Sequence, residues 1–227
     1  MINAFRFMLI ALVGAFSSIS VHADESEVDY SLSTKLWSNE IKVVQSPGTS
    51  VTTTRANSPI VAFTAKKGNY FATISTLMAS SYTYRTVWMK RNDVDLTLGY
   101  RLTDNVSLIG GYKQLTFQDG SYTNDYIEKI KGAYLGVSGF KMVGDATYIY
   151  GNYSQMLSPS RSGTSNIEIN ESLKFNAYEY GLGYAINKTS QLTLGYRVQT
   201  FQARNVSFSR DEKNTMQGMI FGLNVGF

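Results

Sequence analysis

The stretch Asp95–Phe117, DLTLGYRLTDNVSLIGGYKQLTF, contains two runs of alternating apolar and polar residues around the polar segment 103–105. In the first run, Leu96, Leu98 and Tyr100 occupy every second position. A period of two is typical of a β-strand that has one apolar face and one polar face. The stretch therefore predicts a β-hairpin.

The hexapeptide LTLGYR occurs twice in the chain, at Leu96–Arg101 and at Leu192–Arg197. The stretch Glu179–Phe201, EYGLGYAINKTSQLTLGYRVQTF, aligns with Asp95–Phe117 without gaps at an offset of 84 residues (179 − 95 = 84). The second hexapeptide then matches the return strand of the first hairpin. The repeat is therefore a strand motif used in two hairpins, and it is not a simple tandem duplication.

The same alternation along the chain predicts ten strands. Their expected ranges are 28–40, 59–67, 70–82, 93–102, 106–117, 129–142, 146–157, 174–186, 191–203 and 215–227. Short turns are expected between alternate pairs, and longer connections at 41–58, 83–92, 118–128, 158–173 and 204–214. Short turns at one end, long loops at the other and an even strand number are typical of transmembrane barrels. We therefore expect an all-β fold, a transmembrane antiparallel up-and-down β-barrel of about ten strands, with eight as the alternative.

Residues 1–23 have the features of a secretory signal peptide. Arg6 supplies a positive charge, Phe7–Phe16 is an apolar run, and Val21-His22-Ala23 matches a small-x-small cleavage site. The apolar run is too short for a transmembrane helix, which needs about 20 residues. We expect cleavage after Ala23 and a barrel over residues 24–227.

The composition argues against several classes of site. The chain has no Cys, so disulfides and thiolate metal sites are excluded. The net charge of +4 is spread without a basic block, which gives nucleic-acid binding little support. The single histidine, His22, lies in the expected signal peptide, so the mature chain would lack an imidazole. We expect no enzyme activity, no metal and no cofactor, although a Ser–Lys or paired-carboxylate site remains formally open.

The chain resembles the bacterial outer-membrane β-barrel proteins over residues 24–227. The resemblance rests on the expected signal peptide, the Gly-Tyr strands, the short turns and the last strand, MIFGLNVGF, which ends at Phe227. In that family the barrel-assembly machinery reads the last strand with its terminal Phe. The resemblance thus implies this role for Phe227, the machinery as a partner, and a location in the bacterial outer membrane.

Charged residues form two expected pairs on the polar face of the hairpins. Folding the first hairpin about its turn places Asp95 opposite Lys113, and the 84-residue offset places Glu179 opposite Arg197. Opposite charges at directly opposed positions attract by roughly 0.2–1 kcal/mol. We expect these pairs to face the lumen, with Arg101 as a further lumen residue near the turn. Such charges either fill the interior or line a polar path, and filling is the favoured interpretation.

An aromatic and basic cluster is expected at the outer rim, in and beside the second long connection. Its members are Tyr82, Tyr84, Arg85, Trp88, Lys90 and Arg91. Such side chains suit contact with lipid and with lipopolysaccharide phosphates, which we expect as partners. An ordinary interfacial girdle is the favoured alternative.

Three functions fit this architecture. The first is a structural barrel, or one that passes small solutes through a narrow lumen, since ten strands are few beside the 16–18 of porins. The second is a surface-binding, adhesin-type barrel that acts through its outer loops. The third is a soluble barrel that carries an apolar ligand, which the Tyr residues on the apolar face disfavour. Leu115, Phe117 and Phe201, at inward positions near the outer end, indicate a constricted or simply well-packed lumen.

Overall fold

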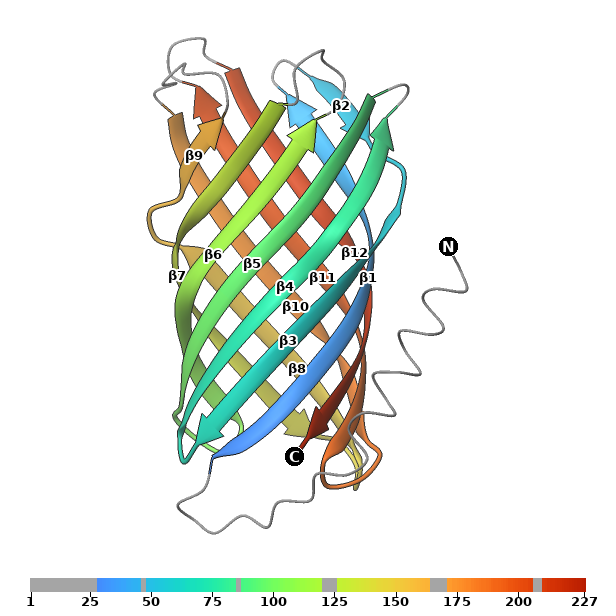
Figure 1. Ribbon diagram of the computed structural model, residues 1–227, viewed down its shortest axis with the longest axis vertical. Helices are drawn as coiled ribbons and strands as arrows, with labels where there is room; N and C mark the ends of the chain where they lie inside the picture. Colours follow the sequence, from blue (N-terminus) through green and yellow to red (C-terminus); the bar gives the residue numbers. More distant parts are fainter. Residues whose placement is uncertain (1–27, 46–47, 85–86, 120–125, 164–170, 206–209) are drawn as a thin grey trace.

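The computed structural model of the chain describes residues 28–45, 48–84, 87–119, 126–163, 171–205 and 210–227. The expected signal peptide lies outside these residues. The described part folds into a single cylinder of tilted strands (Figure 1). Within it there is no helix with the length and hydropathy needed to cross a membrane.

Ten strands form a closed antiparallel ring. They are β1 (Asp29–Gln45), β3 (Ala56–Lys67), β4 (Tyr70–Tyr84), β5 (Val87–Arg101), β6 (Val106–Asp119), β7 (Tyr126–Met142), β8 (Thr147–Met156), β10 (Glu171–Ala185), β11 (Ser190–Asn205) and β12 (Arg210–Gly226). The first and last strands close the ring, from Ser31 opposite Gly226 to Gln45 opposite Glu212. Closure leaves no strand edge unpaired. A sheet in hydrocarbon must be closed in this way, because no water is present to bond its backbone groups. The expected ten-stranded barrel is confirmed.

Two short strands extend the wall at one end, and the sequence did not predict them. β2 (Thr49–Thr52) pairs with the end of β1, and β9 (Ser160–Gly163) pairs with the start of β7. β2 pairs with β1 beyond the last residue that pairs with β3, and β9 pairs with β7 beyond the last residue that pairs with β8. The long connection expected at 83–92 is wrong, because β4 continues to Tyr84 and β5 already begins at Val87. The wall is therefore taller than expected.

The opposite end carries the short turns that the sequence predicted. Lys67 opposes Tyr70 across a two-residue turn, in which Gly68 adopts a φ of 56°, a conformation that favours glycine. The repeat is visible here as well, since Thr103 Oγ1 and Asn187 Oδ1 accept hydrogen bonds from the amides of Val106 (3.1 Å) and Ser190 (2.7 Å). By the rule for bacterial barrels we name this the periplasmic end and the other the outer end.

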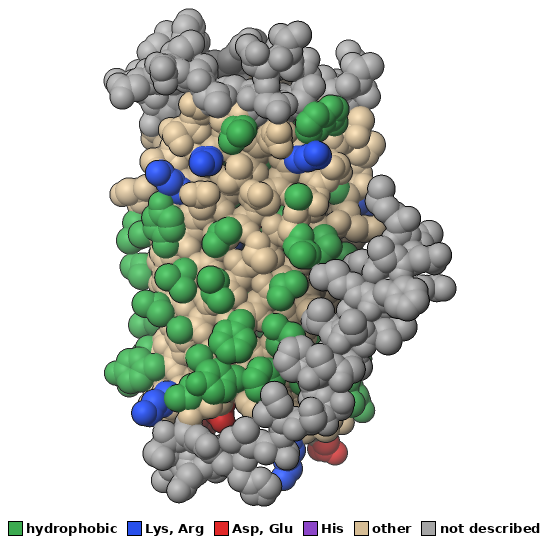
Figure 2. Space-filling model, in the orientation of Figure 1, with side chains coloured by type: hydrophobic (Ala, Val, Ile, Leu, Met, Phe, Trp, Pro, Cys, Tyr) green, Lys and Arg blue, Asp and Glu red, His purple; other side chains and the backbone are tan. Residues whose placement is uncertain are grey.

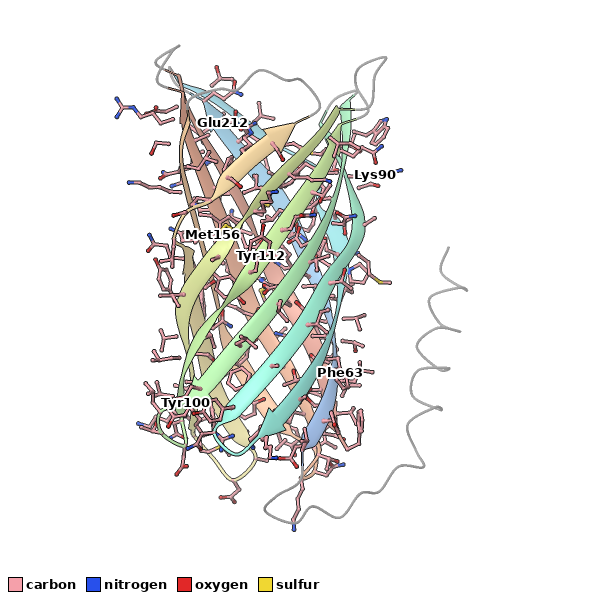
Figure 3. The ribbon with its side chains drawn as sticks, turned by 60° about the vertical axis from the view of Figure 1, so that its left-hand side comes forward. Phe63, Lys90, Tyr100, Tyr112, Met156 and Glu212 are labelled. Carbon is pink, nitrogen blue, oxygen red and sulfur yellow. The ribbon has the colours of Figure 1, made fainter. Side chains whose placement is uncertain are left out.

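The apolar face of the sheet points outward. Leu98 is 58 % exposed, Leu135 57 % and Tyr184 53 %. Figure 2 shows hydrophobic side chains over much of the wall and basic side chains near the outer rim. In Figure 3, Phe63 and Tyr100 lie near the periplasmic end, whereas Lys90 and Glu212 lie near the outer end. A soluble carrier would enclose its apolar face, so the soluble-carrier alternative does not fit this wall.

The strands are longer than a bilayer requires. β1, β7 and β12 have 17 residues each. At about 3.3 Å per residue and a tilt near 45°, such a strand rises about 40 Å along the axis, against an apolar band of about 25 Å. The outer ends of the strands therefore project beyond the hydrocarbon.

The glycines of the repeat make room for aromatic rings in the lumen. A Cβ at Gly99 would lie 2.0 Å from Cζ of Phe71, and one at Gly183 would lie 2.0 Å from Cζ of Tyr148. Each ring belongs to the residue directly opposite on the neighbouring strand. The repeated Gly-Tyr unit thus places Tyr toward lipid and leaves a gap on the inner face, which a ring from the next strand fills.

Candidate functional site in the barrel lumen

Every strand of the ring contributes a lumen-facing side chain that is 3 % exposed or less. We call this set the central plug. Its members, in chain order, are Trp37, Ser58, Tyr82, Arg91, Leu115, Ile130, Met156, Phe175, Phe201 and Met216. Because all ten strands take part, the plug fills the cross-section of the lumen, as in other narrow barrels.

The plug is mainly apolar and has two halves. One half gathers around Trp37 on β1 and its neighbouring strands, and the other around Leu115 and Phe201 on the opposite wall. Phe117 packs against both halves. The inward bulk that the sequence indicated is therefore packed into a continuous core.

Arg91 is the charged centre of the plug and is 1 % exposed. Its Nε donates a 2.8 Å hydrogen bond to Asp93 Oδ1, and Nη2 contacts Asp93 Oδ2 and Gln199 Oε1. A buried cation needs such a carboxylate partner, because water no longer solvates it.

Two guanidinium groups lie close to the ring of Trp37. The Cζ atoms of Arg91 and Arg197 lie 5.5 Å and 5.4 Å from the centre of the ring. The indole Nε1 donates to the carbonyl oxygen of Gly218 (3.3 Å). Cation–π contacts of this kind hold the ring in place in a water-poor interior.

Asp95 and Lys113 are directly opposed on β5 and β6, in the expected register. Lys113 Nζ lies 2.6 Å from Asp95 Oδ2, and both side chains are largely buried in the lumen. Tyr134 Oη donates to Asp95 Oδ1 (2.8 Å), and Thr97 Oγ1 lies 3.2 Å from the same oxygen. The carboxylate is therefore fully engaged in a structural network.

Glu179 and Arg197 are also directly opposed, on β10 and β11. The closer partner of Glu179, however, is Lys35 of β1, whose Nζ lies 2.7 Å from Oε1, against 3.7 Å from Arg197 Nε to Oε2. Tyr150 Oη donates to Oε1 as well (3.2 Å). One buried carboxylate thus has two cationic partners.

A cavity of about 370 Å³ opens on the periplasmic side of this network. We call it the vestibule. Its lining includes Lys35 and Glu179 at the network, Phe140 and Tyr148, and the polar side chain of Gln191. Phe140, Tyr148 and Gln191 lie at strand ends that adjoin the periplasmic turns. The plug lies on the far side of Glu179, so the vestibule is blind.

The structure separates the residues expected to form one outer-rim cluster, so that expectation is corrected. Tyr82 and Arg91 are buried in the plug. Trp88 and Lys90 face outward, with Lys90 Nζ 5.1 Å from the centre of the Trp88 ring. Tyr84 ends β4, and Arg85 lies outside the described residues.

A β-bulge explains the position of Tyr82. Pairing of β4 with β5 shifts between Leu77 and Ser80. Leu77 and Tyr82 are both buried, although a regular strand would place residues five positions apart on opposite faces of the sheet. One inserted residue moves the side chains beyond it to the other face. Tyr82 Oη consequently donates to Asn39 Oδ1 in the lumen (2.6 Å).

Outward-facing lysines surround the outer end of the wall. We call them the lysine collar, and they are all exposed: Lys42, Lys90, Lys129, Lys131, Lys174 and Lys213. Among the described residues of the same face, the carboxylates of Glu40 and Asp211 lie 3.7 Å from Arg55 and Arg204. These two carboxylates therefore balance the charges of two arginines, and the charges of the collar lysines are not neutralised by them.

The two remaining predicted residues lie at the periplasmic end. Arg101 is half-buried and opposes Ser107. Phe227 exchanges backbone hydrogen bonds with Tyr30, and the two rings stack at 6.3 Å.

Trp37 and Lys35 are lumen residues that the sequence did not predict. Alternation on β1 could have placed both inside, because they lie at every second position along the strand, on the same face as the buried Asn39 and Ile41. The contact of Lys35 with Glu179 joins strands that are not adjacent, so hairpin register could not have revealed it.

No protein-family model and no curated protein matches this sequence. Among solved structures, the chain is similar to the outer membrane protease OmpT from Escherichia coli, with a TM-score of 0.57 and 11 % identity over 93 % of this chain and 100 % of that one. It also matches the translocator domain of autotransporter NalP from Neisseria meningitidis, with a TM-score of 0.42 and 10 % identity over 98 % of this chain and 95 % of that one. Neisserial surface protein A gives a TM-score of 0.40 and 12 % identity over 89 % of this chain and 100 % of that one. The chain thus has the fold of the bacterial outer-membrane β-barrels.

Proposed function

We propose that the chain is a closed outer-membrane barrel that acts through its outer surface and does not conduct solutes. The observation that carries this proposal is the central plug, to which all ten strands contribute buried side chains. A solute path would need continuous water through the lumen, and the plug leaves no room for it. The plug therefore favours a barrel that acts through its outer surface over one that passes solutes.

The lysine collar supports lipopolysaccharide as the partner at the outer surface. Lys129 and Lys131 alternate with the buried Ile130, so both point away from the lumen. They lie beyond Leu135, an exposed apolar residue of the same strand. Ammonium groups just above an apolar band are placed to meet lipid phosphates, and each contributes about 1 kcal/mol near an anionic surface.

The proposed role is not enzymatic. OmpT is a protease by name, but 11 % identity carries only its fold to this chain. The described residues contain no group of three or more His, Cys, Asp or Glu side chains that could hold a metal. In the lumen, Arg91, Lys113 and Glu179 each contact an oppositely charged side chain, namely Asp93, Asp95 and Lys35, and these ion pairs fit a structural role.

The collar is tested by removing its charges. The variant Lys129→Gln/Lys131→Gln/Lys174→Gln should bind lipid A roughly a hundredfold more weakly, since three contributions of about 1 kcal/mol are lost. Binding is measured on the detergent-solubilised protein with lipid A and with dephosphorylated lipid A.

The matched control removes three exposed lysines of the periplasmic end: Lys67→Gln/Lys141→Gln/Lys188→Gln. This control should bind lipid A as the unaltered protein does. Equal weakening in both triple variants, or equal binding of the dephosphorylated lipid, would remove the collar from the proposal.

A further inference from the structure

The periplasmic part of the lumen has a surplus of positive charge, although the vestibule lining itself holds one cation, Lys35, and one carboxylate, Glu179. Among the described strand residues, the lumen-facing ionisable side chains from the mouth of the vestibule up to Arg197 are five cations and three carboxylates, by the alternation of the strands: Lys35, Lys66, Arg101, Lys113 and Arg197, against Asp29, Asp95 and Glu179. Lys66 and Lys113 lie 3.8 Å and 2.6 Å from Asp29 and Asp95. Glu179 alone faces both Lys35 and Arg197.

This surplus is accessible from the cavity at Lys35. Its side chain is 28 % exposed, whereas the Glu179 side chain is 3 % exposed. Of the two charged groups in the lining, the ammonium group is therefore the more accessible to an entering solute. In a narrow, low-dielectric pocket such an asymmetry attracts anions.

The cavity wall is aromatic as well as polar. The Phe140 and Tyr148 rings pack edge to face, with centroids 5.9 Å apart, and both line the vestibule. Tyr148 Oη donates to Gln191 Oε1 (2.8 Å), which fixes the ring and leaves the amide nitrogen of Gln191 as a donor. A volume of about 370 Å³ lies within the range of small-molecule sites.

We propose that the vestibule is a periplasm-facing binding site for a small carboxylate with an aromatic body. The carboxylate of the ligand pairs with Lys35, and its ring packs against Phe140 and Tyr148. The ligand binds and leaves at the same mouth, because the central plug closes the other side. This site is independent of the lysine collar, so either can fail without the other.

The test uses benzoate as the probe, with the full-length barrel in detergent micelles. Saturation-transfer NMR and calorimetry should give saturable binding of benzoate and much weaker binding of its neutral counterpart, benzyl alcohol. Comparable binding of the two, or no saturable benzoate signal, would overturn the proposal.

Two single variants separate binding from structure, because they should act in opposite directions. Lys35→Gln should weaken benzoate binding about tenfold or more, since it removes a charge-assisted hydrogen bond. Glu179→Gln should tighten binding, since it removes the internal competitor for Lys35 and Arg197. Weakening by both variants would mean that the network only supports the fold, which would refute the site.

The matched control is Lys188→Gln, which removes one exposed cation from the turn between β10 and β11. It should leave benzoate affinity unchanged. A loss equal to that of Lys35→Gln would show that net charge alone governs the signal, which would also overturn the proposal. The heat-dependent gel mobility of each variant reports whether its barrel is folded.

Discussion

The Arg91 guanidinium lies 5.5 Å from the centre of the Trp37 ring inside the barrel. The two residues come from β5 and β1, which are not neighbours in the ring. Their contact therefore crosses the lumen instead of following the wall. It joins the charged centre of the plug to its largest apolar side chain.

The buried pair of Arg91 and Asp93 should be sensitive to the loss of one partner. Arg91→Met leaves the Asp93 carboxylate buried without its cation, and the free energy of unfolding should fall by about 3–5 kcal/mol. The double variant Arg91→Met/Asp93→Leu should recover most of that loss. Urea unfolding in detergent, followed by Trp fluorescence, measures both.

Arg204→Gln supplies the contrast for this experiment. Arg204 and Asp211 are 75 % and 66 % exposed and lie 3.7 Å apart. An exposed pair of this kind contributes at most about 1 kcal/mol. A larger effect at Arg204 than at Arg91 would contradict the view that burial decides the cost.

Gly218 should tolerate no side chain. A Cβ there would lie 1.9 Å from the carbonyl oxygen of Ser38 and 2.7 Å from Cα of Asn39, which are backbone atoms and cannot turn away. Gly218→Ala should therefore destabilise the barrel by about 1–3 kcal/mol or more. Gly144→Ala is the control, because its Cβ would meet nothing closer than Thr147 Cβ at 3.9 Å. The same urea titration compares them, and equal midpoints would show that the β1–β12 seam can open.

Phe227 should matter for assembly more than for stability. Phe227→Ala should slow insertion into proteoliposomes that contain the barrel-assembly machinery, as the resemblance to outer-membrane barrels implies. Phe221→Ala removes the same side chain from the same face of β12, where Phe221 is 52 % exposed. Equal insertion rates for the two variants would contradict a special role of the last residue.

Local patterns in the sequence were sufficient to predict the hairpins and their register. The position of Asp95 opposite Lys113 follows from the turn and the period of two, and the repeat extends this register to Glu179 and Arg197. These relationships involve adjacent strands joined by a short turn. They depend only on local geometry, which a single sequence contains.

Two features were outside the reach of such patterns. The bulge after Leu77 moves the following side chains of β4 to the opposite face of the sheet. The sequence of that stretch contains no signal for a bulge. Regular alternation therefore predicts Tyr82 at the rim instead of in the lumen. The contact of Lys35 with Glu179 depends on closure of the ring, which brings β1 and β10 face to face across the lumen. The packing of the plug is set in the same way, by the assembled barrel as a whole.

Single-channel recording in planar bilayers tests the closed lumen most directly. The unaltered protein should insert without discrete conductance steps, whereas Trp37→Ala/Phe117→Ala, which removes the two rings beside Arg91, should conduct. Trp88→Ala, on the outer wall, should stay silent. Discrete steps from the unaltered protein, or equal silence from the double variant, would contradict closure of the lumen by these side chains.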